Sequence, residues 1–316
     1  MKLRSLKLRK SEAGDQTKMA GRKRRRLKYI SVLPSLITLM NGACGFIAIA
    51  FASRSPVLGY SLPFLRRSAE TSLSIAGYLI LVAMIADLLD GRVARMTRTT
   101  SSFGGQLDSL SDAISFGVAP AFLMLKVMDI HLDYLKIENL SLSMLVGRLI
   151  FFSAILYVIC AIVRLARFNV ENDEDAAAHM NFSGIPTPAA AGVITSMVIF
   201  HQQLLNMLIG QNSGFFRTFE IISLSVFPVT CLLMGILMVS RICYPHLANQ
   251  LIRSKKTLHG LLIFFAAVIL AIWNIQLALV AAFCGFALYG ILRWLFGKMF
   301  GKLSSKRQIK NQAASE

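Results

Sequence analysis

The sequence predicts an all-α fold, a polytopic transmembrane helical bundle. Of its 316 residues, 55% are hydrophobic and 16% are charged, and a soluble domain of this length carries more charge. The apolar residues fall in blocks of about 20, the length that a helix needs to cross roughly 30 Å of hydrocarbon. The net charge of +18 gathers largely at the two ends of the chain. These observations argue against an ordinary soluble domain and predict an integral membrane protein.

Eight apolar segments are long enough to be membrane-spanning helices. An even number of spans places both ends of the chain on one side, and the basic residues there place that side in the cytoplasm. The last two segments are joined by almost no chain, which predicts a tight helical hairpin. The eight segments are 31–52, 72–95, 106–128, 146–168, 185–205, 219–242, 258–275 and 277–296.

Basic clusters flank these segments. Residues 1–28 contain twelve Lys and Arg, and the tail from Lys298 contains five more. A basic run alone would permit nucleic-acid binding, but beside a membrane span it indicates an anchor that touches anionic membrane lipids. We therefore expect no nucleic-acid partner. The loop at 53–71 opposes the predicted topology, because it carries Arg54, Arg66 and Arg67 and is expected outside the cytoplasm.

Four aspartates lie in or at the ends of two consecutive apolar segments. They are Asp87 and Asp90 on one segment and Asp108 and Asp112 on the next. Carboxylates at membrane depth are costly and require a compensating partner. Ion pairs with Arg92, Arg95 or Arg98 would compensate one or two of them, whereas a bound divalent cation would compensate the whole group.

The spacing of the aspartates favours the cation. Asp87 and Asp90 are three residues apart on one helix, and Asp108 and Asp112 are four apart on the next, so each pair shares a helix face. The connection between the segments is short, so the helices are expected to be antiparallel neighbours. Oxygen ligands without nearby Cys or His suit Mg²⁺ or Mn²⁺. Four carboxylates could hold two such ions, an arrangement that clamps a pyrophosphate.

Small residues accompany these aspartates. Gly91 and Ala94 share the face of the first pair, and Gly104 and Gly105 open the second helix. Such residues permit either the close approach of a ligand or helix–helix packing. Arg95 follows, with a guanidinium that suits phosphate.

One motif unites these residues: Asp87, Asp90, Gly91, Ala94, Arg95, Gly104, Asp108 and Asp112. It resembles the signature of the CDP-alcohol phosphatidyltransferase family, with every fixed position present. The resemblance implies a six-helix membrane enzyme, homodimeric, with its active site near the cytoplasmic face. The last two apolar segments then form two C-terminal helices beyond the six-helix core, as in other serine-specific members.

The same resemblance implies roles for individual residues. Asp87, Asp90 and Asp108 would bind metal, and Asp112 would complete the metal site and act as the base that deprotonates the attacking hydroxyl. Further positions match residues that bind CDP-diacylglycerol: Gly91, Ala94, Arg95 and Ser101, together with Pro34, Thr38 and Asn41 in the first span.

Four stretches resemble the serine-using branch of the family, the phosphatidylserine synthases. They are 33–41, 108–117, 164–169 and 184–190, and the resemblance as a whole covers about residues 30 to 245. Ser35 departs from the pattern, because relatives often have Asn there. The implied acceptor is L-serine, whose hydroxyl would attack the lipid-bearing phosphorus of CDP-diacylglycerol and release CMP.

The physical chemistry of two of these stretches fits a serine site but does not require one. Arg164 and Arg167 are three residues apart and could hold a carboxylate or could contact lipid phosphate. Asn169 could bind the amino group, and Thr187 lies in a Pro-rich turn whose backbone N–H groups would be free.

Two rival functions use the same residues. A sister enzyme would use glycerol phosphate, inositol phosphate or choline as its acceptor, and an Arg pair accepts phosphate as readily as carboxylate. A divalent-cation transporter would use the aspartates to line a path, but the other apolar segments contain no acidic residue except Glu220, at the edge of 219–242.

These interpretations divide the chain into four parts. They are a basic cytoplasmic extension at 1–28, a catalytic transmembrane core at 29–245, a C-terminal transmembrane hairpin at 246–297 and a basic cytoplasmic tail at 298–316. We expect the protein to be a multi-pass component of the inner (plasma) membrane.

Overall fold

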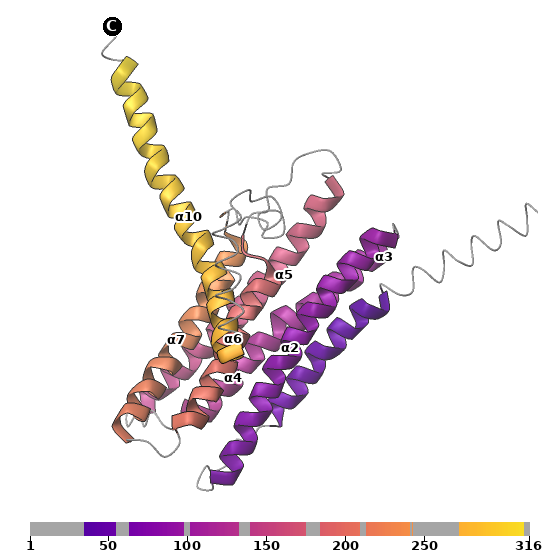
Figure 1. Ribbon diagram of the computed structural model, residues 1–316, viewed down its shortest axis with the longest axis vertical. Helices are drawn as coiled ribbons and strands as arrows, with labels where there is room; N and C mark the ends of the chain where they lie inside the picture. The colour runs from indigo at the N-terminus through magenta and orange to yellow at the C-terminus, as the bar shows by residue number, and fades with distance from the viewer. Residues whose placement is uncertain are drawn as a thin grey trace, which may run out of the picture.

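The computed structural model describes residues 35–54, 63–97, 102–132, 140–174, 184–208, 213–240, 242 and 272–312. Within these ranges every regular element is a helix, and most of the helices lie side by side as long rods (Figure 1). The prediction of an all-α bundle is therefore confirmed. The elements are the helix Ser35–Ser53, α2 (Pro63–Thr97), α3 (Ser102–Asp112), the π-helix η1 (Ala113–Val118), α4 (Ala119–Leu132), α5 (Leu140–Glu174), α6 (Thr187–Leu208), α7 (Ser213–Val239) and α10 (Ile275–Gln312).

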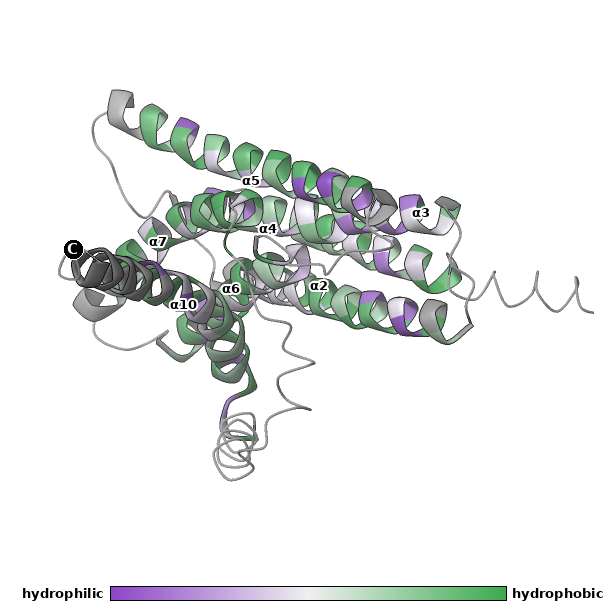
Figure 2. Cartoon of the chain, turned by 90° about the horizontal axis from the view of Figure 1, so that it is seen from above, coloured by the Kyte–Doolittle hydropathy of each residue, from purple (hydrophilic) through white to green (hydrophobic). Residues whose placement is uncertain are grey.

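Six helical segments among the described residues are long and apolar enough to cross a membrane, which confirms the polytopic fold. Large apolar side chains such as Phe46, Val82 and Phe152 point outward from them. Figure 2 shows apolar residues along the rods and polar residues gathered around the start of α3 and the neighbouring end of α2. The six segments are Ser35–Ser53, Ser72–Val93, Phe103–Ile130, Met144–Val170, Ile221–Val239 and Ile275–Phe296.

Helix α6 lies inside the bundle. It packs against α2, α4, α5, α7, α10 and η1. Its buried residues include the polar Ser196, His201 and Gln202. The predicted segment at 185–205 is therefore a helix, but it is not among the six that are apolar enough to span a membrane. A helix surrounded by protein does not need the continuous apolar surface that lipid demands.

The predicted segment at 106–128 is one continuous span with a π-helical section in its middle. This section, η1, begins directly after Asp112, and π-helical sections are frequent at functional sites. The Tyr157 hydroxyl of α5 donates to the Phe116 carbonyl oxygen at 2.9 Å. The Ser115 hydroxyl donates to the Asn41 carbonyl oxygen at 2.8 Å. Hydrogen bonds to two neighbouring helices thus hold η1 in place.

Only the second half of the predicted C-terminal hairpin lies within the described residues. The predicted segment at 258–275 lies almost entirely outside the described residues. Asn274 precedes α10, and its side-chain oxygen accepts from the Leu277 backbone N–H at 3.0 Å, a typical N-cap contact. The helix α10 packs on α6, where a side chain at Gly192 would collide with Phe283. It runs without a break to Gln312, so the structure marks no boundary at residue 298.

Candidate functional site

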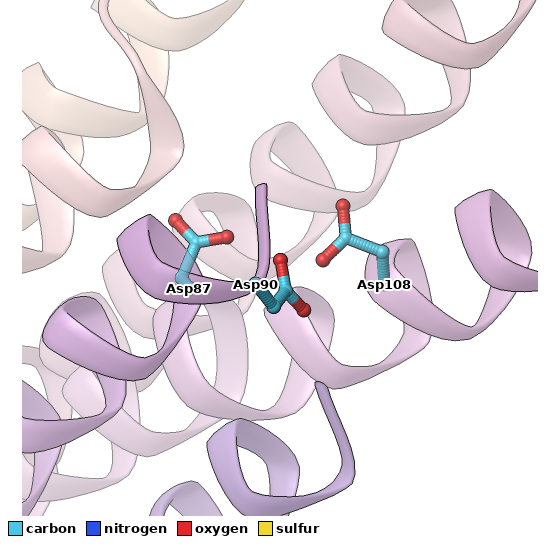
Figure 3. A group of neighbouring side chains, drawn as sticks. All are labelled: Asp87, Asp90 and Asp108. Atoms are coloured by element: carbon cyan, nitrogen blue, oxygen red, sulfur yellow. The ribbon is translucent and has the colours of Figure 1, made fainter. Parts of the chain in front are cut away.

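Three carboxylates meet where α2 ends and α3 begins. Asp87 and Asp90 come from α2 and Asp108 comes from α3, and each offers an oxygen within 4.8 Å of the others. Figure 3 shows the three side chains gathered between the two helices. The residues from 98 to 101 separate the two helices, so the short connection brings the two predicted helix faces together.

Asp112 lies one helical turn beyond Asp108 on the same helix. It interacts electrostatically with Asp87, Asp108 and Asp90. Its Oδ1 accepts a hydrogen bond of 2.9 Å from the Asn41 side-chain amide. Asp112 is 8% exposed and Asp90 is 6% exposed, so both carboxylates are largely removed from solvent. The four aspartates thus form one group, although Asp112 lies outside the tight cluster of three.

Among the described side chains, no cation forms an ion pair with any of the four aspartates, although Arg164 lies close enough to Asp112 for a longer-range electrostatic interaction. The ion pair found among these side chains joins Lys126 to Asp129 at 3.2 Å. The side chains of Arg95 and Arg98 lie outside the described residues. Asp108 Oδ1 is buried without a hydrogen-bond partner. Clustered carboxylates with an unpaired buried oxygen fit a hard divalent cation, which accepts oxygen ligands.

The small residues of the motif leave space beside the aspartates. A side-chain carbon at Gly91 or at Gly105 would meet no atom of the described residues within 4 Å. Packing against the described residues therefore does not explain these two glycines, and the alternative of an approaching ligand remains. Four predicted contacts lie outside the described structure: Pro34 and Ser101 as residues, and Ala94 and Arg95 as side chains.

The two remaining nucleotide candidates, Thr38 and Asn41, lie on the helix Ser35–Ser53 and contact the aspartates. The Thr38 hydroxyl donates to Asp90 Oδ2, and the Asn41 amide donates to Asp112. These contacts join residues 52 and 71 positions apart in the sequence. The spacing of the motif gave no sign of them.

The serine candidates separate into an inner and an outer group. Arg164 Nη1 donates to the Thr187 hydroxyl at 2.6 Å, and Arg164 Nε is buried without a hydrogen-bond partner. Asp112 is close enough to interact electrostatically with this guanidinium. The Arg167 side chain is instead exposed. The structure therefore brings Arg164 and Thr187 toward the carboxylates but leaves Arg167 outside.

A turn before α6 places Thr187. Gly184 has a φ of 91° and donates its N–H to the Ile242 carbonyl at 2.9 Å. A side chain there would lie 2.3 Å from the Met238 carbonyl oxygen. Only glycine combines this backbone conformation with so close an approach. The start of α6 is thereby tied to the end of α7.

Asn169 contacts a residue that the sequence analysis did not single out. Its amide donates to the Ser109 hydroxyl at 2.8 Å. The pair lines a groove of about 350 Å³ between α3 and α5, whose walls are mostly apolar. Ser109 directly follows Asp108, and this position between two motif aspartates is the sequence feature that could have indicated a residue of the site.

Together these features describe an integral membrane protein with a carboxylate cluster at the end of two neighbouring spans. The model of the CDP-alcohol phosphatidyltransferase family matches residues 31–289, and the chain belongs to this family. Members of the family use a divalent metal, which agrees with the donor set of the cluster.

Three relatives of the chain have names that refer to serine. The chain is 31% identical to a CDP-diacylglycerol–serine O-phosphatidyltransferase of Helicobacter pylori, over 84% of this chain and 92% of the relative. It is 32% identical to the protein of that name in Methanocaldococcus jannaschii, over 86% of this chain and 98% of the relative. It is 35% identical to an archaetidylserine synthase of Methanothermobacter thermautotrophicus, over 54% of this chain and 60% of the relative.

Proposed function

We propose that this protein transfers the phosphatidyl group of CDP-diacylglycerol to the hydroxyl of L-serine, which yields phosphatidylserine and CMP. The aspartate cluster between α2 and α3, in a chain of this family, is the observation that carries the proposal. The names of the relatives support serine in particular. They differ in the lipid that they mention, phosphatidyl or archaetidyl, but they share serine as the acceptor.

The proposed metal ligands are Asp87, Asp90, Asp108 and Asp112, and the proposed ions are Mg²⁺ or Mn²⁺. Four carboxylates supply enough oxygen atoms for two ions. When bound, such ions neutralise the pyrophosphate and the departing CMP.

The proposed reaction begins at Asp112. Its carboxylate accepts the proton of the serine hydroxyl, while the Asn41 amide holds one of its oxygens at 2.9 Å. The serine oxygen attacks the lipid-bearing phosphorus and forms a new P–O bond. The bond from that phosphorus to the oxygen of CMP breaks, and CMP leaves with the electron pair. The largely buried site excludes bulk water, which would otherwise compete as the acceptor.

Arg164 is the proposed partner of the serine carboxylate. Its guanidinium is oriented by the hydrogen bond to Thr187 and still has a buried, unpartnered Nε. A guanidinium can hold a carboxylate through two parallel hydrogen bonds. Asn169 is the proposed contact of the amino group. Arg167, which is exposed, fits a lipid-phosphate contact better than a place in the serine pocket.

The nucleotide part of CDP-diacylglycerol is proposed to lie over Gly91 and Gly105, where the described residues leave space. Ala94, Arg95, Ser101 and Pro34 are proposed contacts by resemblance to the family, since their side chains are outside the described structure. Arg95 would face a phosphate.

An acceptor panel tests the proposed function. Purified protein receives CDP-diacylglycerol and Mn²⁺ with serine, glycerol phosphate, inositol phosphate or choline, and CMP release and the lipid product are measured. We expect CMP and phosphatidylserine with serine alone. CMP release with another acceptor in place of serine would identify a sister enzyme, and no CMP with any acceptor would contradict the phosphatidyltransferase activity.

The substitution Arg164→Lys tests the serine pocket. We expect the KM for serine to rise about tenfold while the KM for CDP-diacylglycerol changes by less than about twofold, because lysine cannot reproduce the two-pronged contact. Steady-state kinetics with each substrate varied in turn provide the measurement. Arg148→Lys is the matched control, since Arg148 is exposed on the same helix. An unchanged serine KM would remove Arg164 from the serine pocket.

The finer organisation is also proposed. The parts 1–28, 29–245, 246–297 and 298–316 correspond to extension, catalytic core, hairpin and tail, and the active protein is a homodimer by resemblance to the family. The membrane is the inner (plasma) membrane, and both ends and the aspartates face the cytoplasm. Twelve basic residues before the first span outweigh Arg54 and the two arginines of the first turns of α2, Arg66 and Arg67, which the sequence placed in a loop at 53–71.

Labelling of single cysteines tests the sidedness. In a background without the five native cysteines, Ser5→Cys, Tyr60→Cys and Gln308→Cys are exposed in intact cells to a thiol reagent that cannot cross membranes. We expect labelling at position 60 alone, because the two basic ends are retained in the cytoplasm. Labelling at positions 5 and 308 without labelling at 60 would invert the topology.

A further inference from the structure

We propose that the helix Ser35–Ser53 is a positioning element for the carboxylates, with Thr38 orienting Asp90 and Asn41 orienting Asp112. This inference rests on the proposed function and deepens it. It assigns the two residues to the alignment of the metal ligand and of the base, and not to direct contact with CDP-diacylglycerol.

The first contact joins Thr38 to Asp90. The Thr38 hydroxyl donates to Asp90 Oδ2, and both side chains are buried. A carboxylate rotates about its side-chain bonds unless a partner holds it, and burial strengthens the partner's effect. The hydrogen bond from Thr38 fixes Asp90 Oδ2, and because the carboxylate is rigid it also fixes the direction of Oδ1.

The second contact ties Asn41 at two points. Its side-chain amide donates to Asp112 Oδ1 at 2.9 Å, and its backbone carbonyl accepts from the Ser115 hydroxyl at 2.8 Å. Asn41 has no exposed surface. Asp112 ends α3 and Ser115 lies in η1. Asn41 therefore holds the chain on both sides of the point where the helix changes from α to π geometry.

The helix carries these two donors on one face, together with glycines that permit its close approach. Thr38 and Asn41 are three residues apart, and Gly42 and Gly45 each follow one of them by four. A side-chain carbon at Gly45 would lie 2.4 Å from Ser115 Oγ and 2.6 Å from Ser115 Cα. Glycine at this position allows the backbones to come near enough for the Asn41 contacts to form.

Positioning and direct substrate contact predict different kinetics. The Thr38 hydroxyl and the Asn41 amide already donate to carboxylates. If they act by positioning, their loss weakens metal binding or slows turnover. If they act by contacting CDP-diacylglycerol in its ground state, their loss raises the KM for that substrate and leaves turnover unchanged.

The test compares Thr38→Val, Thr38→Ser and Asn41→Leu with the unaltered protein. Mn²⁺ binding is measured by electron paramagnetic resonance on purified protein without substrate, and kcat and both KM values are measured separately. Thr38→Val should weaken Mn²⁺ binding by about tenfold, since a hydrogen bond to a charged group is lost. Thr38→Ser keeps the hydroxyl and should restore Mn²⁺ binding to within about threefold. Asn41→Leu should lower kcat roughly tenfold to a hundredfold, with both KM values within about twofold.

Two controls isolate the effect of position. Ser53→Ala removes a hydroxyl of the same helix that bonds to the Ala50 carbonyl, and Ser153→Ala removes a buried hydroxyl that bonds to the Ile150 carbonyl. Both should retain Mn²⁺ binding and kcat. Thermal unfolding of every variant separates a loss of folding from a loss of alignment, and a Thr38→Ser variant that binds Mn²⁺ as weakly as Thr38→Val would overturn the inference.

A raised KM for CDP-diacylglycerol with unchanged kcat and unchanged Mn²⁺ binding would also overturn it and would make the two residues substrate contacts. Failure of the proposed function is a separate result. In that case the unaltered protein releases no CMP with serine, while the Mn²⁺ measurements on the Thr38 variants still decide whether this helix orients Asp90.

Discussion

Asp108→Asn is expected to abolish turnover, with kcat/KM reduced by roughly a thousandfold or more. A metal-bound pyrophosphate gains several kcal/mol of transition-state stabilisation, and each 1.4 kcal/mol or so corresponds to a factor of ten in rate. Asparagine keeps the size of the side chain but removes its charge. Asp108 is well suited to this test, because its buried Oδ1 has no hydrogen-bond partner that the substitution could break.

The same loss is expected for Asp87→Asn, Asp90→Asn and Asp112→Asn, and the losses should not add. Residues that act as one unit show nearly the full effect when any one of them is removed. CMP release is measured at saturating Mn²⁺ with protein whose membrane insertion has been verified. The matched control is Asp129→Asn, since Asp129 is half-exposed, pairs with Lys126 and belongs to the same continuous span. Near-full activity in any of the four variants would contradict a shared site.

The bundle and the core of the site could be predicted because both depend on local spacing. A run of about 20 apolar residues determines a spanning helix almost by itself. Carboxylates three or four residues apart share a helix face. The short connection after α2 requires α3 to begin close to the end of α2. The convergence of Asp87, Asp90 and Asp108 followed from these two facts and is present in the structure.

Other features depend on packing between distant segments and left no local signal. Arg164 and Arg167 have the same residue type and a favourable spacing, but the rotation of α5 against its neighbours turns one inward and leaves the other exposed. The hydrogen bonds from Thr38 and Asn41 cross 52 and 71 residues of sequence. The π-helical turn after Asp112 is fixed by Tyr157 from another helix. Single-sequence patterns do not encode such relative rotations.

The hydropathy of α6, which is lower than that of the six spanning segments, also reflects packing between distant segments. Its environment is protein on most sides, and buried polar residues such as Gln202 and Ser196 are tolerated there. A hydropathy profile judges each helix as if lipid surrounded it, so it ranks a central helix below the peripheral ones. The peripheral α10 shows the opposite case, because only 11% of its spanning window is buried.

Removal of the divalent cation is expected to eliminate activity completely and reversibly. A chelator removes the cation whose positive charge would neutralise the substrate pyrophosphate. CMP release should then fall below detection. Mg²⁺ or Mn²⁺ added in excess should restore it, because both accept oxygen ligands. Zn²⁺ should restore it poorly, since the cluster contains no Cys or His.

A stability measurement supplements the activity assay. A ligand that binds only the folded state at about a hundred times its Kd stabilises the protein by about 2.7 kcal/mol, so Mn²⁺ should raise the unfolding temperature of the unaltered protein. The increase should vanish in Asp108→Asn and persist in Asp129→Asn, because only the first substitution alters the cluster. Activity that survives exhaustive chelation, or an increase that Asp108→Asn retains, would mean that the carboxylates between α2 and α3 are compensated by a protein cation such as Arg95 or Arg98 and not by a metal.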